Sequence, residues 1–315
     1  MGFGQIEPEF FWQVYRKRVD LWQMAAQELC QRLQIPSDRF ETTAAGSNLI
    51  ARVSEHVMLK IFPPFHRHQW ESEYRVMQHL DGQLQLPIPR YLGAGDAGED
   101  WTYLVMSRLQ GITLDLRWPT LDVGEKKRIL FDIGKIMARV HAVTVGDLAT
   151  LAPDWNAFVQ GQVKACRARH LKLGMPPWFT DQVDDYVQHM QPLLPQAFAP
   201  VILTGEYTPF NLMVPAEGPL EKVSGMIDFG DAMIGFADYD LLGPSLFLCE
   251  GHPELVAALL DGYDRRTLTK ELQDRLMLLQ ILHRYSDFHG QLSLKDWQLR
   301  AKSIEDLKNL IWPLV

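Results

Sequence analysis

The sequence has few cysteines, no long hydrophobic run and no excess of positive charge. Its three cysteines, Cys30, Cys166 and Cys249, are far apart, which excludes a disulfide framework and zinc-ligand spacing. No apolar stretch approaches the roughly 20 residues of a membrane helix. The first ten residues, MGFGQIEPEF, contain two acids and no basic cluster, unlike a signal peptide. We therefore expect a cytoplasmic chain with buried thiols and no membrane partner.

Basic side chains are outnumbered, with 31 Lys and Arg against 39 Asp and Glu and a net charge of −8. This balance argues against nucleic acid as a partner, because binding to the phosphate backbone needs concentrated positive charge. Residues 1–110 carry a net charge of −2 and the remainder −6. Most of the acidic side chains in the second segment are explained by their contribution to solubility. It also mildly favours a cationic, amine-bearing small molecule as ligand.

Internal repeats, low-complexity tracts and long linkers are also absent, and 315 residues suffice for one large domain or two lobes. Residues 8–33 place apolar side chains at helical spacing, with Pro8 in the first turn. Residues 40–109 then alternate strand-like segments with turns around one helix over 68–80. We expect residues 1–109 to form an N-terminal helix plus a small antiparallel β-rich nucleotide-binding lobe.

The remainder, residues 110–315, is mainly helical by its apolar periodicity. Helices are expected over 124–143, in two pieces between 153 and 195, and over the segments 238–250, 253–266, 269–288 and 295–312. Short strand-like pieces return only between 200 and 229. The predicted class is therefore α+β, with a β-rich N-lobe and a larger α-helical catalytic and substrate-binding C-lobe.

A pattern of two acids and one amide lies at the ends of short strands in the second lobe. Glu206 and Asn211 lie in TGEYTPFN, and Asp228 follows in GMIDFGDA. Transfer of a phosphoryl group to a hydroxyl needs such a set. One carboxylate orients the hydroxyl and takes its proton, while an amide oxygen and a second carboxylate hold Mg²⁺ against ATP phosphates.

The first lobe contains residues suited to the nucleotide. Lys60 lies inside the apolar segment VMLKIF, where a lone lysine needs a buried partner or a ligand. Glu73, in the following helix, is the candidate partner that would orient Lys60 onto the α- and β-phosphates. The sequence also offers a turn that could cover phosphates and a segment whose backbone could meet an adenine edge: Gly46, Ser47 and Asn48 for the first, and Met106, Ser107 and Arg108 for the second.

The order of these motifs, GSN, VMLKIF, ESEYRVM, YLVMSRLQG, TGEYTPFN and MIDFGDAMIGFADYDLL, resembles the aminoglycoside phosphotransferase and choline kinase family. The similarity runs from about residue 40 to about residue 250. It implies a bilobal protein-kinase-like fold and an ATP- and Mg²⁺-dependent kinase whose acceptor is a hydroxyl-bearing small molecule. It also implies the site residues: Glu206 in the catalytic acid position, Asn211 and Asp228 as metal ligands, Lys60 as phosphate lysine and Glu73 as its helix partner.

Two positions depart from the family pattern H-G-D-x-x-x-x-N. Thr204 stands where His is usual, and Glu206 where Asp is usual. Glu is one methylene longer, and a misplacement of about 1 Å can cost on the order of 10²-fold in rate. Phosphoryl transfer depends more on positioning and metal charge than on the base, so a loop adapted to Glu could remain active. The alternatives are a pseudokinase that binds nucleotide without turnover, and an enzyme that transfers a nucleotidyl group.

Other polar residues have simpler explanations. His66 and His68 lack further ligands nearby, so we reject a metal site there. Asp231, Asp238 and Asp240 are interpreted as caps, turn residues or loop anchors. Asp287 and Asp296 are weak candidates for substrate contacts, and surface solvation explains each more simply. For Trp155, Trp178 and Phe179, core packing is favoured over a substrate wall.

Overall fold

The computed structural model describes residues 3–43, 46–205, 207–264 and 266–314. The chain forms two compact units, one of residues 1–110 with 227–232 and the other of residues 111–226 with 233–315. The short segment 227–232, which contains Asp228, thus packs in the first unit although most of its sequence neighbours belong to the second. The division into domains after residue 109 stays a prediction.

The first unit contains a five-stranded sheet in which every neighbouring pair is antiparallel, with strand order β1-β2-β3-β5-β4. Its strands are β1 (Glu41–Thr43), β2 (Leu49–Arg52), β3 (Val57–Phe62), β4 (Tyr91–Gly98) and β5 (Trp101–Ser107). Strand β3 is central, with Lys60 opposite Ile50 on one side and Leu104 on the other. The expected antiparallel sheet is confirmed.

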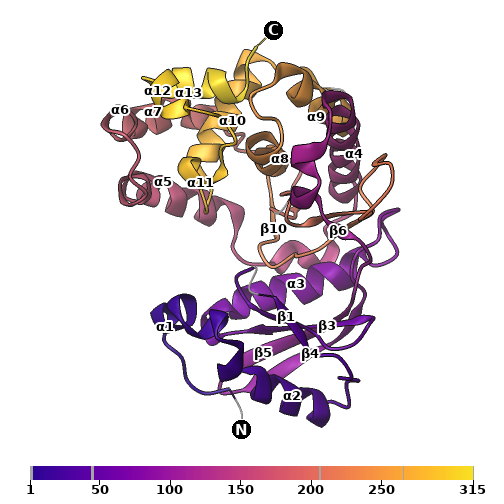
Figure 1. Ribbon diagram of the computed structural model, residues 1–315. Coiled ribbons are helices and arrows are strands. Elements are labelled where there is room, and N and C mark those ends of the chain that lie inside the picture. Colours follow the sequence, from indigo (N-terminus) through magenta and orange to yellow (C-terminus); the bar gives the residue numbers. More distant parts are fainter. Residues whose placement is uncertain (1–2, 44–45, 206, 265, 315) are drawn as a thin grey trace. The chain divides into compact units, whose positions relative to one another are not determined.

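Helices cover both faces of this sheet, which explains why β3 is apolar along most of its length (Figure 1). They are α1 (Pro8–Gln13), α2 (Gln23–Arg32) and α3 (Arg67–Leu80). Side chains alternate between faces along a strand. Leu59 and Ile61 join the core beneath the N-terminal helices, whereas Lys60 points to the face covered by α3 and contacts Glu73 there.

The single helix expected over residues 8–33 is wrong, because α1 and α2 are separated by two 3₁₀ turns at Tyr15–Lys17 and Val19–Leu21. The backbone leaves helical geometry at Val14 (φ −126°) and Trp22 (φ −127°). Phe11 and Trp22 are both fully buried in one core. A straight helix would hold these residues about 16 Å apart along its axis. Packing of both aromatic rings on one sheet face therefore overrides the helical periodicity.

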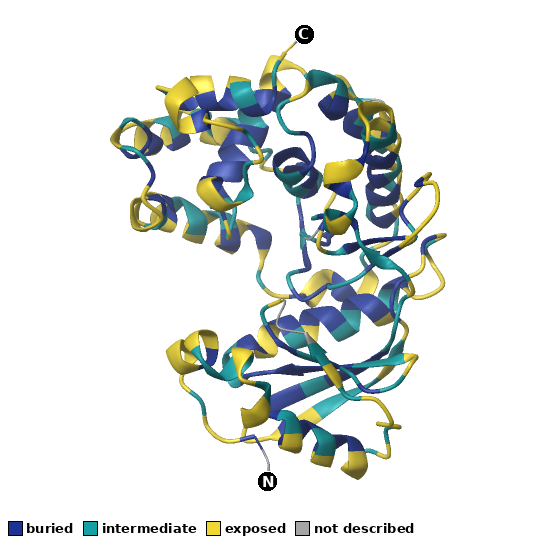
Figure 2. Ribbon diagram, in the orientation of Figure 1, coloured by how far each residue is buried: buried dark blue, intermediate teal, exposed yellow. Residues whose placement is uncertain are grey.

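The second unit is largely helical, as expected. Its longer helices are α4 (Val123–His141), α5 (Trp155–Lys172), α7 (Val183–Met190), α9 (Pro253–Asp264), α10 (Lys270–Leu282) and α13 (Ile304–Ile311), and its short ones are α6 (Pro177–Thr180), α8 (Leu242–Phe247), α11 (Phe288–Gln291) and α12 (Trp297–Arg300). Helix α4 begins with a capping box between Asp122 and Glu125. Its apolar stripe is buried while its other side meets solvent (Figure 2).

The C-terminal helix expected over residues 295–312 is interrupted. Helix α12 ends at Arg300 and α13 begins at Ile304, with the Ser303 hydroxyl accepting from the Asp306 N–H as the cap of α13. An N-cap of this type favours a new helix start over continuation. No described helix of either unit is long and apolar enough to span a bilayer.

Two small sheets in the second unit flank the TGEYTPFN segment and the segment that contains Asp228. Their strands are β6 (Ile112–Thr113), β7 (Val201–Leu203), β8 (Leu212–Val214), β9 (Gly225–Met226) and β10 (Met233–Gly235). Strand β7 pairs with β10, and β8 lies between β6 and β9. The TGEYTPFN segment therefore joins β7 to β8, and the segment that contains Asp228 joins β9 to β10. The short strands expected between 200 and 229 are confirmed by β7, β8 and β9, but their restriction to that range is wrong, because β6 precedes it and β10 follows it.

Candidate active site

A buried cation with two carboxylates forms the centre of the first unit's site. The Lys60 ammonium donates to Glu73 Oε2 at 2.7 Å and to Asp228 Oδ1 at 3.0 Å. The side chains of Lys60 and Glu73 are 3% and 2% exposed, whereas that of Asp228 is 30% exposed. The structure thus brings together three predicted site residues from β3, α3 and the 227–232 segment. Only Asp228 presents much of its carboxylate to solvent.

Electrostatics favour a charged lysine at this position. Burial alone would lower the pKa of Lys60, but the negative charges of Asp228 and Glu73 outweigh it and raise the pKa above its ordinary value. Burial raises the pKa of Glu73, and nearby Asp228 adds to that increase while Lys60 opposes it. One cation facing two carboxylates leaves a local excess of negative charge, which suits a further cation beside Asp228.

The backbone at Asp228 has an uncommon conformation. Its φ of +66° lies in the left-handed region, which non-glycine residues seldom adopt and which clusters at functional sites. The Gly230 N–H donates to Asp228 Oδ1 at 3.2 Å. A Cβ added at Gly230 would come within 3.3 Å of that same oxygen. The local turn therefore fixes the direction of the carboxylate.

A second set of contacts also joins α3 to the 227–232 segment, one helical turn before Glu73. The Gln69 amide donates to Asp231 Oδ1 at 3.3 Å, and the Asn48 amide donates to Gln69 at 3.2 Å. His66 Nδ1 lies 2.9 Å from the oxygen of the buried Asn48 side chain. Because Gln69 and Glu73 are four residues apart, both face the 227–232 segment. Asp231 is thus a loop anchor, one of the roles expected from sequence.

The turn predicted to cover phosphates joins β1 to β2. Gly46 has φ +87°, a conformation that favours glycine. Gly46 is exposed and Ser47 half-buried, but the Asn48 side chain points inward to His66 and Gln69. Any contact of Asn48 with a phosphate would therefore be made by its backbone. The phosphate role of the three residues stays a prediction.

The segment predicted to meet adenine lies where β5 ends. The Ser107 N–H donates to the Arg90 carbonyl at 2.9 Å, and the Arg108 N–H donates to the His56 carbonyl at 2.7 Å. Met106 pairs with Met58 and Tyr91 in the sheet. Two of the predicted N–H donors are thus already used within the unit. The adenine contact stays a prediction and would depend on other backbone groups of this segment.

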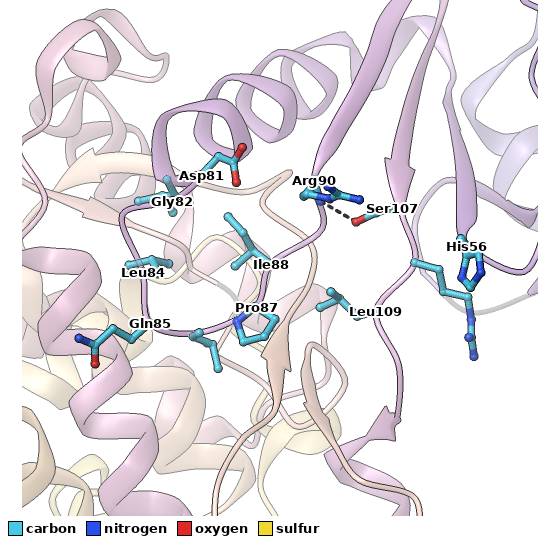
Figure 3. A pocket seen from close by; sticks show the side chains of 13 residues that line it. His56, Asp81, Gly82, Leu84, Gln85, Pro87, Ile88, Arg90, Ser107 and Leu109 are labelled. Carbon is cyan, nitrogen blue, oxygen red and sulfur yellow. Dashed lines mark hydrogen bonds between the residues drawn. The ribbon is translucent and has the colours of Figure 1, made fainter.

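A cavity of about 620 Å³ adjoins this segment (Figure 3). Its apolar lining includes Leu84, Ile88 and Leu109, and its polar rim includes His56 and Arg90. The Arg90 N–H donates to the Ser107 hydroxyl at 2.8 Å, which braces the strand end against the α3–β4 connection. The end of β5 is therefore held from both neighbouring strands.

In the second unit, a buried aspartate holds the start of the TGEYTPFN loop. Asp240 accepts from the Thr204 N–H at 3.1 Å and from the Gly205 N–H at 2.8 Å. Its Oδ2 also lies 3.0 Å from His141 Nε2, and the other ring nitrogen of His141 lies 2.8 Å from the Tyr263 hydroxyl. Asp240 is thus a loop anchor, one of the roles expected for it. Glu206, the predicted catalytic acid, lies outside the described residues.

Asn211 lies at the end of the same loop, directly before β8. Its N–H donates to the Thr208 carbonyl at 3.1 Å, which closes a tight turn. Asn211 and Asp228 belong to different compact units. Among the described residues, no group of three or more His, Cys, Asp or Glu side chains could hold a metal ion. Carboxylate and amide oxygens nevertheless suit Mg²⁺, whose remaining ligands are commonly phosphate oxygens and water.

Three residues that take part in the contacts of Asp231 in the first unit and of Asp240 in the second were not predicted from sequence. Gln69 could have been found, because it precedes Glu73 by one helical turn. His141 and Tyr263 come from α4 and α9, far from the loop in sequence, and no local pattern marks them. Asp287, a weak substrate candidate, caps α11 by accepting from the His289 and Gly290 N–H groups. Trp155 is buried and packs edge-on against Tyr239, as expected for a core residue.

The antiparallel sheet, the helical remainder and the buried lysine–carboxylate cluster define a kinase-like fold. Solved structures with this fold align over nearly the whole chain. A GDP complex of aminoglycoside 2′-phosphotransferase IIIa has a TM-score of 0.68 at 16% identity, over 92% of this chain and 97% of that one. A ternary complex of APH(2″)-IIa with streptomycin and ATP has a TM-score of 0.59 at 14% identity, over 92% and 98%.

A third structure, a putative aminoglycoside phosphotransferase from Ralstonia eutropha JMP134, has a TM-score of 0.57 at 15% identity, over 82% of this chain and 85% of that one. At these identities the likeness shows the fold. Residues 42–277 match the model of the phosphotransferase enzyme family, and the chain belongs to that family. The first 41 residues lie outside the match. The family and the kinase-like fold expected from the motif order are confirmed.

Proposed function

We propose that this protein is a small-molecule kinase that transfers the γ-phosphoryl group of ATP to a hydroxyl of its substrate. The observation that carries the proposal is the buried Lys60, paired with Glu73 on α3 and with the partly exposed Asp228. A lysine fixed in this way presents a constant charge to phosphates, and its helix partner holds it in place. Family membership and the nucleotide complexes of similar folds support this assignment.

Eight of the predicted residues have a role in the transfer step. Lys60 neutralises phosphate charge and Glu73 orients it. Asp228 and Asn211 would hold Mg²⁺, which when bound neutralises charge on the transferred group. Glu206 would orient the acceptor hydroxyl and take its proton. Gly46, Ser47 and Asn48 would cover the phosphates.

The proposed acceptor is an aminoglycoside-like or amino-alcohol-like compound. Two observations support this class. Solved structures with a similar fold include complexes of those proteins with streptomycin, gentamicin and kanamycin. The net charge of −6 on residues 111–315 favours a cationic ligand.

The decisive experiment is ATP turnover with a panel of aminoglycosides, amino alcohols and sugars, with products identified by mass spectrometry. A phosphorylated acceptor, lost in Asp228→Ala, is the expected result. An adduct heavier by a nucleotidyl group would instead identify a nucleotidyl transferase. No product from any acceptor, and no background ATP hydrolysis that Asp228→Ala removes, would overturn the proposal.

A second candidate function is nucleotide binding without turnover, and the Glu206 and Thr204 substitutions favour it. In that case ATP with Mg²⁺ raises the melting temperature through preferential binding to the folded state. Glu206→Gln would then leave every measured activity unchanged. For an active kinase the same substitution should lower the rate while ATP still stabilises the protein.

A further inference from the structure

The N-terminal segment, residues 3–40, lies before the family-matched region and packs on the sheet face opposite α3. Phe3, Phe11 and Trp22 are buried there, and the Phe3 ring stacks on Trp101 of β5 at 5.0 Å. The Trp101 indole N–H also donates to the Gly4 carbonyl at 2.8 Å. The segment is therefore part of the folded core of the first unit.

One side chain of this segment reaches the turn that is predicted to cover phosphates. The Arg16 guanidinium donates a hydrogen bond to the carbonyl oxygen of Gly46. The same guanidinium lies over the ring of Trp12, 5.2 Å from its centroid. Arg16 itself is half-buried. Trp12 therefore limits the conformations of the arginine that holds the turn.

The other end of the turn is held through the same segment. The Trp12 ring meets His66 edge-on at 5.5 Å. His66 in turn contacts the Asn48 side chain at 2.9 Å. The N-terminal segment thus contacts Gly46 directly and Asn48 through His66, so contacts from this segment hold both ends of the three-residue turn.

The contact of Arg16 with the Gly46 carbonyl also determines the direction of the Ser47 N–H. In a trans peptide the carbonyl of one residue and the N–H of the next point in opposite directions within one plane. Because Arg16 fixes the Gly46 carbonyl, it also fixes the Ser47 N–H, which points away from Arg16. Oriented backbone N–H groups at such turns are donors for phosphate oxygens.

We infer that Arg16 is a positioning residue for nucleotide phosphates, because its bond to the Gly46 carbonyl orients the Ser47 N–H toward them. The inference rests on the proposed function, since it requires nucleotide to bind at this turn. It makes residues 3–40 part of the nucleotide site, although they lie outside the family match. The effect of Arg16 should depend on the phosphates of the ligand and be absent for the nucleoside.

The test compares the dissociation constants of ATP, ADP and adenosine in the presence of Mg²⁺, measured by calorimetry on the full chain. We expect Arg16→Ala to weaken ATP by about tenfold, equivalent to one hydrogen bond of ~1.4 kcal/mol, and to leave adenosine binding unchanged. Arg16→Gln, which keeps an N–H donor, should lie between Arg16→Ala and wild type. Arg18→Ala is the matched control, because Arg18 is exposed and pairs with Asp20.

The melting temperatures of wild type and both Arg16 variants, measured without ligand, show whether a variant has lost structure in general. Equal ATP affinity in wild type and both Arg16 variants would overturn the inference while leaving the proposed kinase function intact. So would equal weakening of ATP and adenosine, which a purely structural brace would produce. If Arg16→Ala does not fold, the ATP-to-adenosine comparison in Arg16→Gln decides. Failure of the wild-type protein to bind any of the three ligands would overturn the proposed function itself.

Discussion

The Lys60 ammonium and the Glu73 carboxylate lie 2.7 Å apart, with side chains that are 3% and 2% exposed. The contact joins the central strand β3 to α3. A buried pair of this kind is costly to break, because the remaining partner is left charged in a low-dielectric environment. Asp228 also contacts Lys60, so the removal of Glu73 and the removal of Lys60 have different consequences. Removing Glu73 leaves Lys60 with a counterion, whereas removing Lys60 leaves two facing carboxylates.

This asymmetry predicts a pH-dependent stability defect in Lys60→Met. Without the cation, the pKa of Glu73 should rise further above its unfolded value. An acid whose folded pKa is raised loses stability as pH rises from the unfolded pKa toward the folded one. The free energy of unfolding of Lys60→Met should therefore fall more at pH 8 than at pH 5.5. The loss relative to wild type at pH 8 should be on the order of 3 kcal/mol. Urea unfolding at both pH values measures the effect.

The double variant Lys60→Met/Glu73→Gln is the control. It removes the titrating carboxyl, so most of the additional loss between pH 5.5 and 8 should disappear, although nucleotide binding should stay weak. If Lys60→Met lost equal stability at both pH values, the proposed coupling between Lys60 and Glu73 would be wrong.

The sequence revealed this pair because its signal is local. A charged lysine between Leu59 and Ile61 is unusual in an apolar strand and needs a partner. Glu73 follows in a clear helical pattern. The antiparallel sheet and helix α3 were predictable for the same reason, since alternation, helical spacing and turn residues mark each element. Helix α4, with its capping box and continuous stripe, was equally clear.

Contacts between distant segments could not be predicted in the same way. The break at Val14 follows from the need to bury Phe11 and Trp22 together, which depends on Trp101 some 80 residues later. The contact of His141 with Asp240 has no sequence pattern either. In both cases the determining partner becomes a neighbour only after folding.

Two helical glycines in different surroundings predict opposite effects of substitution by alanine: Gly134 lies where α4 contacts α9, and Gly161 lies in α5 with open space beside it. A Cβ at Gly134 would lie 2.3 Å from the Leu259 carbonyl oxygen, so Gly134→Ala must separate the helices. We expect a loss of about 1–3 kcal/mol. Gly161, inside α5, has no atom within 4 Å of an added Cβ. Gly161→Ala should stabilise by about 0.5–1 kcal/mol through higher helix propensity. Denaturant midpoints measure both, and a gain in Gly134→Ala would contradict the packing.

Burial of His170 predicts weaker stability in acid. The side chain is fully buried beside Phe179 and Phe288, and its Nε2 donates to the Ile281 carbonyl at 3.1 Å. Burial lowers the pKa of His170 to about 4. Below the unfolded pKa of about 6.5, the unfolded state binds more protons, so stability falls as pH drops from 6.5 toward 4.

His170→Phe should reduce this acid dependence by on the order of 1–3 kcal/mol between pH 7 and pH 4.5, although the lost hydrogen bond lowers stability at pH 7. Melting temperature against pH gives the measurement. His189 on α7 is exposed, so His189→Gln should keep the wild-type slope. An unchanged slope in His170→Phe would show that another group causes the acid sensitivity.

Asp240 predicts a defect in turnover that is separate from nucleotide binding. Its two carboxylate oxygens accept from the Thr204 and Gly205 N–H groups. Asparagine has only one acceptor oxygen, so Asp240→Asn must lose at least one of these bonds. The loop that carries Glu206 would then be less well positioned. We expect kcat to fall by about 10- to 100-fold, with little change in the dissociation constant for ATP, because the Lys60 cluster belongs to the other unit.

Asp238 provides a stringent comparison for this prediction. It is similarly buried and lies in the same 3₁₀ turn, Ala237–Leu241, but its partners among the described residues are Arg266 and Arg275. Asp238→Asn should therefore lower the melting temperature without a comparable loss of kcat below that temperature. Equal losses of kcat in the two variants at matched fractions of folded protein would mean that Asp240 acts through general stability. A selective loss in Asp240→Asn would show that anchoring of Thr204 and Gly205 sets the rate.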